Sequence, residues 1–115
     1  MYISLMYSKE LIKGTLTPII LSLLEENSRM YGYEITQNVK ERTLGKIEIT
    51  EGALYPTLHK LEADGILKTE EVFIGKRVRK YYSLTKAGNV AAAQRVSELK
   101  DFMSTLKMIL TPKHI

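Results

Sequence analysis

The segment TEGALYPTLHKLEADG, residues Thr50 to Gly65, decides the fold that the sequence predicts. Thr50 is a good N-cap and Gly65 a good C-terminal stop, so we expect a helix between them. Within it Leu54, Leu58 and Leu61 recur at helical spacing and define one apolar side. The segment is therefore predicted to be an amphipathic helix that packs on a core through these leucines.

The opposite face of this helix lacks the charged residues that a solvent-exposed helix usually carries. A rotation of about 100° per residue brings together there Gly52, Tyr55, Pro56, His59, Lys60 and Ala63. Gly and Pro both lower helix stability, and Pro does so by removing a backbone hydrogen bond. Such a slim face suits the major groove of DNA, which is about 12 Å wide and admits one helix.

The start of the same helix is suited to a phosphate, because capping by Thr50 leaves N–H groups of the first turn available at the positive end of the helix dipole. Tyr55 and Lys60 can donate hydrogen bonds to phosphates or bases, and His59 can donate or accept. The candidate DNA-contacting residues of this helix are Thr50, Glu51, Gly52, Ala53, Tyr55, Pro56, His59 and Lys60.

Three of these residues have other interpretations. Tyr55 also fits a half-buried packing residue, and His59 alone is an ordinary surface histidine. Glu51 suits the helix dipole but repels phosphate. Three roles for Glu51 therefore remain: it accepts a hydrogen bond from a cytosine amino group, it pairs with a neighbouring cation, or it only caps the helix.

Residues 9–26 carry leucines and isoleucines at helical spacing, with Ser8 as a plausible N-cap. Gly14 and Pro18 leave two alternatives for this first helix. It starts at Thr17, with Pro18 at the first helical position, or it runs through with a kink.

Residues 31–43 predict a second, shorter helix with Ile35 and Val39 facing inward. The alternation in residues 46–50, KIEIT, places Ile47 and Ile49 on one face and predicts a very short strand.

Residues 68–84, KTEEVFIGKRVRKYYSL, predict a β-hairpin with Gly75 and Lys76 in a two-residue type II′ turn. This register sets Phe73 opposite Val78 and Glu71 opposite Lys80. One face of the second strand then holds Val78, Tyr82 and Leu84, which we expect in the core. The other face holds Arg77, Arg79 and Tyr81, so the arginines should point outward. The basic run is either a solvated strand or a nucleic-acid contact formed by Lys76, Arg77, Arg79 and Lys80.

Residues 86–110 predict a last helix of roughly 37 Å, capped by Thr85. Apolar residues in its distal half need a partner, because the body of one small domain is too short to cover them. Folding back on the first helix of the same chain is one alternative. We expect instead a dimer interface of Leu16, Ile20, Leu99, Phe102, Met103, Leu106, Ile109 and Leu110.

The composition fits one small domain of 115 residues with a net charge of +4. No apolar run approaches the roughly 20 residues that span a bilayer, and the N-terminal segment lacks the features of a secretory signal. The absence of cysteine fits the cytoplasm, where we expect the protein to be. The only histidines are His59 and His114, and no carboxylate cluster or phosphate loop is present. We therefore expect no enzyme, no metal and no cofactor.

Four segments together resemble the PadR family of transcriptional regulators: ELIKGTLTPIILSLL (10–24), YGYEI (31–35), GALYPTLHKLEADGIL (52–67) and RKYYSLTKAG (79–88). The resemblance implies a dimeric winged helix that binds palindromic operator DNA, usually as a repressor. It places Leu54, Tyr55 and Pro56 on the recognition helix, puts the basic residues before Tyr81 on the wing, and brings Tyr33 near the DNA backbone. Family members often have Pro in place of Glu51, so the resemblance leaves the operator sequence open.

The predicted fold class is mainly α with a small β-hairpin. It consists of a winged helix-turn-helix over residues 1–85 and a C-terminal dimerisation helix over residues 86–115, in one compact unit. The resemblance also implies a small aromatic or apolar effector, for which Phe102, Met103 and Met108 are pocket candidates, although methionine at this spacing is usually core. The competing hypothesis is a winged-helix module that binds protein without specific DNA binding.

Overall fold

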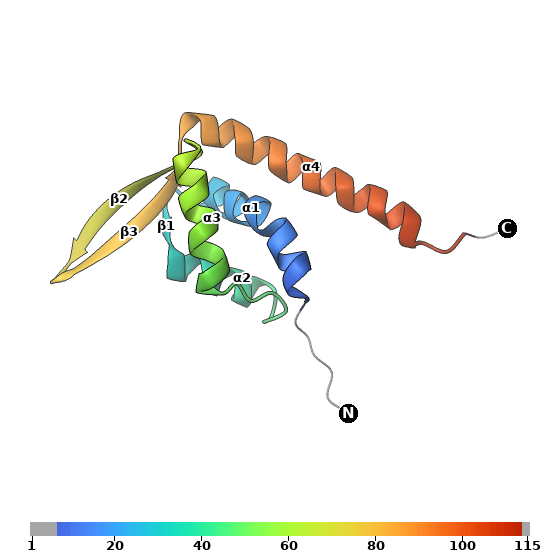
Figure 1. Ribbon diagram of the computed structural model, residues 1–115, viewed down its shortest axis with the longest axis horizontal. Helices are drawn as coiled ribbons and strands as arrows, with labels where there is room; N and C mark the ends of the chain where they lie inside the picture. The colour runs from blue at the N-terminus through green and yellow to red at the C-terminus, as the bar shows by residue number, and fades with distance from the viewer. Residues whose placement is uncertain (1–6, 114–115) are drawn as a thin grey trace, which may run out of the picture.

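The computed structural model describes residues 7–113, which form a mainly helical winged helix with a three-stranded antiparallel sheet (Figure 1). In chain order the elements are α1 (Lys9–Glu26), β1 (Met30–Tyr31), α2 (Gly32–Arg42), α3 (Glu51–Ala63), β2 (Leu67–Ile74), β3 (Arg77–Leu84) and α4 (Lys86–Leu110). This architecture confirms the predicted fold class. His114 lies outside the described residues.

Helix α1 runs unbroken from Lys9, and the Ser8 hydroxyl caps it by accepting from the Leu11 N–H at 3.4 Å. The alternative start at Thr17 is therefore wrong. Two residues of α1 that we expected at a dimer interface, Leu16 and Ile20, are only 2% and 0% exposed in the single chain. That expectation does not fit the structure, because α1 uses these side chains in the protomer's own core.

The sheet has the strand order β1-β3-β2, and its hairpin has the predicted register. Phe73 pairs with Val78, and Glu71 with Lys80. Gly75 has a φ of +63°, the left-handed conformation that the first position of a type II′ turn requires. The turn chemistry thus fixes the register of the β2–β3 hairpin, which is the wing of the winged helix.

The predicted strand at residues 46–50 is wrong, because these residues form an irregular link without strand pairing. Ile49 is buried in this link and Ile47 is partly buried, so the alternation reflects anchoring in the core. The third strand is instead β1, where Met30 pairs with Tyr82 and Tyr31 pairs with Tyr81.

The hairpin projects from the body of the domain, so its two ends differ in burial (Figure 1). Tyr82, near the base, is 1% exposed, whereas Val78 is 51% and Phe73 is 75% exposed. The expected core position of Val78 is therefore wrong, because no part of the described chain packs over the wing tip.

Helix α4 begins at the predicted cap, where the Thr85 hydroxyl accepts from the Gly88 N–H at 2.9 Å. It packs along α1 and then extends past it (Figure 1). From Asp101 to Lys113 every residue is exposed. Within the described residues no helix is long and apolar enough to cross a membrane.

Candidate nucleic-acid interface

Helix α3 is anchored by the three predicted leucines, of which Leu54 and Leu58 are fully buried and Leu61 is 7% exposed. Its N-cap is Thr50, whose hydroxyl accepts from the Ala53 N–H at 3.2 Å. Both observations confirm the helix predicted from the sequence. They also determine which face of α3 remains available to a ligand.

The face of α3 opposite the leucines is exposed and carries little bulk. A Cβ added at Gly52 would meet nothing within 4 Å, so this residue opens directly to solvent. Pro56 and His59 are also exposed, and Lys60 pairs with Asp64 at 2.9 Å one turn later. Across residues 7–113 Glu51 makes no ion pair, so the interpretation in which it pairs with a cation gains no support within the chain.

Tyr55 is partly exposed and also packs against a neighbouring helix. It is 36% exposed, and its ring also packs against Gly32, the first residue of α2. On its own helix the ring lies 6.2 Å from that of His59, measured between centroids. Packing on α2 therefore fixes where this partly exposed side chain stands on the surface.

A concave surface lies between the first half of α3, the start of α2 and the wing, and the hollow that it forms has a volume of about 650 Å³. Its lining residues are Tyr31, Gly32, Tyr33, Tyr55, His59, Ile74, Arg77, Val78, Arg79, Lys80 and Tyr82. Six residues predicted from the sequence meet here: Tyr33, Tyr55, His59, Arg77, Arg79 and Lys80. The predicted residues Thr50, Glu51, Gly52, Ala53, Pro56, Lys60 and Lys76 do not line this surface, and the sequence reasoning missed Tyr31 and Ile74.

The cations of the wing differ in how they are held. Lys80 lies 3.6 Å from the Glu62 carboxylate of α3, which links the wing to that helix. Arg79 stacks on the Tyr31 ring, with its guanidinium carbon 4.0 Å from the ring centroid. Hydrogen bonding to Tyr81 raises the pKa of Arg79 above its ordinary value, helped by the nearby Tyr31 and Glu34. Arg79 is therefore charged at any working pH.

Tyr81 extends the stacked arrangement across the sheet. Its ring packs edge-on against Tyr31, with the centroids 5.5 Å apart. Arg29 covers it at 4.2 Å and pairs with the Glu70 carboxylate. The side chains of Arg29 and Tyr31 were not singled out from the sequence, because their partners lie far along the chain. The interleaving of arginine and tyrosine in residues 29–33 and 77–82 was the available signal.

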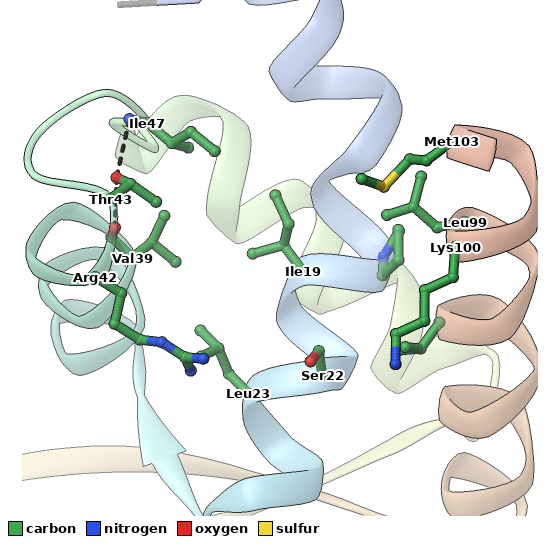
Figure 2. Close-up of a pocket in the computed structure, with 12 residues that line it drawn as sticks. Ile19, Ser22, Leu23, Val39, Arg42, Thr43, Ile47, Leu99, Lys100 and Met103 are labelled. Atoms are coloured by element: carbon green, nitrogen blue, oxygen red, sulfur yellow. Dashed lines mark hydrogen bonds between the residues drawn. The ribbon is translucent and has the colours of Figure 1, made fainter. Parts of the chain in front are cut away.

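A second, apolar groove of about 450 Å³ opens between α1, the end of α2 and α4 (Figure 2). The Thr43 hydroxyl shapes one wall, because it accepts from the Ile47 N–H at 3.1 Å and donates to the Val39 carbonyl at 2.8 Å. The other wall is α4, which contributes Leu99, Lys100 and Met103. Phe102 and Met108 do not line this groove. In the part of the chain that the structure describes, no cluster of histidine and carboxylate side chains is arranged to bind a metal ion.

Comparison with known proteins agrees with this geometry. Residues 20–94 match the model of the transcriptional regulator PadR-like family. A transcriptional regulator from Clostridium thermocellum has 30% sequence identity and a TM-score of 0.81, with 91% of this chain and 99% of that chain covered. A PadR-like transcription factor from Bacteroides fragilis has 32% identity and a TM-score of 0.70, with 87% and 94% covered.

A curated sequence relative, the transcriptional regulator Rv3488 of Mycobacterium tuberculosis, is 35% identical over 68 residues, which cover 59% of this chain and 61% of that protein. The family match includes α2, α3 and the whole wing, which together form the concave surface. The chain therefore belongs to the PadR-like family of transcriptional regulators.

Proposed function

We propose that this regulator binds duplex DNA through α3 and the wing. The observation that carries the proposal is the concave surface, on which Tyr55 and His59 of α3 meet Arg77 and Arg79 of the wing. The first half of α3 enters the major groove, where residues near the start of a recognition helix reach base edges. Gly52 and Pro56 keep the approach narrow, while Tyr55 and Lys60 supply donors.

The wing and the start of α2 hold the flanking backbone in this proposal. Lys76, Arg77 and Arg79 neutralise phosphates, which gives affinity but no sequence information. Tyr33 is 63% exposed beside the same surface and offers its hydroxyl to a phosphate. Specificity then comes from α3, with Glu51 accepting from a cytosine amino group when such a base is present.

A homodimer is the second part of the proposal. The exposed distal half of α4 carries Phe102, Met103, Leu106, Ile109 and Leu110, whose exposed fractions range from 37% to 76%. This stripe continues from the apolar groove, which Leu99 and Met103 line. Exposed apolar surface of this kind is typical of a protein interface. The distal α4 of one protomer therefore packs beside α1 and α4 of its partner.

A two-fold dimer places two recognition helices on a palindromic operator, with the half-sites about 34 Å apart. Occupancy of such a site blocks transcription, so we propose a repressor, and a chromosomal target implies a cytoplasmic location. A small aromatic or apolar effector fits the groove of Figure 2, because the groove is lined mainly by apolar side chains. One wall of the groove is α4, which also forms the proposed dimer interface, so a bound effector would change how the two protomers pack.

The test of DNA binding starts from selection of bound duplexes out of a random pool by the full-length protein. Affinity for the selected duplex should fall steeply with salt, by about 0.9 log units per log unit of salt for each phosphate contact. Replacing Arg77 and Arg79 by Ala should weaken binding to all duplexes and flatten this slope. Replacing Tyr55 or Lys60 should cost more on the selected duplex than on random DNA. Absence of duplex binding at low salt would favour the protein-binding module instead.

A further inference from the structure

The exposed face of the sheet carries one continuous row of aromatic and charged side chains. Tyr31 of β1, Tyr81 of β3 and Glu70 of β2 are direct cross-strand partners, so their side chains share one face. Two guanidinium groups complete the row, since Arg29 stacks on Tyr81 and Arg79 stacks on Tyr31. The row thus joins the wing to the strand that leads into α2.

Tyr31 is a rigid base for this stack. Its backbone pairs with Tyr81 of β3, and its N–H donates to the Glu34 carboxylate at 3.1 Å in the first turn of α2. The position of an arginine side chain on this ring is therefore fixed relative to the helix-turn-helix and not only relative to the projecting hairpin. Without the stack, Arg79 would follow the movements of the wing alone.

Stacking and phosphate binding use different parts of a guanidinium group. The ring covers a face of the planar group, whereas the N–H donors lie in its plane and point out from its edge. The guanidinium carbon lies 4.0 Å from the Tyr31 centroid, and the Tyr81 hydroxyl engages part of the group, so the N–H donors of Arg79 that remain can contact a phosphate. A lysine ammonium has no such planar fork, so it reproduces the charge but not this geometry.

Arg77 provides an internal comparison, because it lies two residues before Arg79 on the same face of β3. Both arginines line the concave surface. Among the described residues Arg77 has no aromatic stacking partner and no ion pair. The two positions therefore differ in whether an aromatic ring contacts the guanidinium, while they share charge, strand and surface.

We infer that Tyr31 is a positioning residue for DNA recognition, which holds the Arg79 guanidinium over its ring so that the free N–H donors meet one defined phosphate beside α3. This inference rests on the proposed DNA binding and adds a functional division within the wing. Arg79 fixes the position of the wing on the DNA relative to the recognition helix. Arg77 contributes positive charge, and this contribution does not require an exact side-chain position.

The experiment uses the full-length protein and the duplex selected from the random pool. The variants are Tyr31→Phe, Tyr31→Leu, Arg79→Lys, Arg77→Lys and the double variant Tyr31→Leu/Arg79→Lys. Affinity is measured over a series of salt concentrations. In the free protein, NMR follows the side-chain protons of Arg79, which the Tyr31 ring current should shift upfield.

The Phe variant should keep both the upfield shift and the affinity, because Phe retains the ring face. Tyr31→Leu should lose the shift and bind roughly three- to tenfold more weakly, the range expected for loss of one cation–π contact. Arg79→Lys should bind equally weakly, and the double variant should be no worse than either single variant. Arg77→Lys should lose less affinity than Arg79→Lys, because a lysine preserves the charge on which the Arg77 phosphate contact depends.

Additive losses in the double variant, or parental affinity of Tyr31→Leu, would overturn the positioning role while leaving DNA binding intact. Equal losses for Arg79→Lys and Arg77→Lys would do the same, and this comparison does not depend on the stability of the Tyr31→Leu variant. Absence of duplex binding by the parent would instead overturn the proposed function, and the positioning role with it.

Discussion

The Tyr55 ring lies directly against Gly32, so α3 touches the first residue of α2 through this side chain. A Cβ built on Gly32 would come within 2.8 Å of the Tyr55 Cζ atom, well inside van der Waals contact. Only glycine leaves the ring its present position. The helix-turn-helix thereby sets the direction in which Tyr55 leaves α3.

Replacing Gly32 by Ala should therefore move Tyr55 without unfolding the domain. The ring is at the far end of a side chain that is 36% exposed, so it can rotate away, and the change in unfolding free energy should stay below about 1 kcal/mol. Affinity for the selected duplex should fall about fivefold or more, because one groove contact is lost. Urea unfolding and duplex titration measure the two effects.

The matched control for Gly32→Ala is the same substitution in a Tyr55→Ala background. Without the ring, the added methyl group no longer meets the three atoms nearest to it and should leave duplex affinity unchanged. If Gly32→Ala weakened binding equally in both backgrounds, the contact with Tyr55 would not explain the loss.

Gly52 allows a test of whether the slim face of α3 serves DNA rather than folding. A methyl group there meets nothing within 4 Å, so Gly52→Ala should raise the unfolding free energy by up to about 1 kcal/mol through helix propensity. Duplex affinity should fall, because the methyl group occupies the space that the groove wall needs. Gly14→Ala in α1, which also meets nothing within 4 Å, is the control for the propensity effect alone. It should stabilise the protein and leave binding unchanged, and equal binding by the two variants would contradict the groove interpretation.

The elements predicted best from the sequence are those with short-range signals. The three leucines of α3 and the Thr50 cap determine that helix within one window, and Gly75 determines the hairpin register. The two-residue strand β1 was not predictable in this way, because two residues show no periodicity. Tyr31 pairs with Tyr81, fifty positions away in the sequence, and that pairing was needed to see the stack.

The sequence predicted the candidate residues of α3 and those of the wing as two separate groups, and the structure shows that members of both groups are neighbours. The wing arginines were named from composition, and Tyr55 and His59 from helical phase, whereas their meeting in one concave surface depends on tertiary packing. For the apolar stripe of α1, the sequence led to a wrong prediction, in which Leu16 and Ile20 were assigned to a dimer interface. The stripe is wide enough to face both the core and a partner, so the sequence did not reveal that Leu16 and Ile20 are used entirely inside the protomer.

Leu106→Asp tests the proposed dimer. The parent should have a light-scattering mass near twice the 13.1 kDa of one chain, and the variant should have the mass of one chain. An aspartate buried in an apolar interface without a partner is strongly unfavourable. Leu106 is 37% exposed in the single chain, so the protomer itself should remain folded. Ser104→Asp, which helical geometry places on the opposite face of α4, is the charge-matched control and should remain dimeric. A parent mass of one chain would contradict the dimer outright.

Stability at alkaline pH should depend on Tyr82, whose burial raises the pKa of its hydroxyl above the ordinary value of 10.0. The folded state favours the neutral phenol, whereas the unfolded chain ionises it freely. The contribution of Tyr82 to the unfolding free energy is thus fully present below about pH 10 and is lost as the pH rises through its higher folded-state pKa. Urea unfolding at a series of pH values should show a steeper loss above about pH 10 in the parent than in Tyr82→Phe, which cannot ionise. Tyr33→Phe, at a position that is 63% exposed, should retain the parental pH dependence. If Tyr82→Phe lost stability as steeply as the parent, burial of this phenol would not be what limits the fold at high pH.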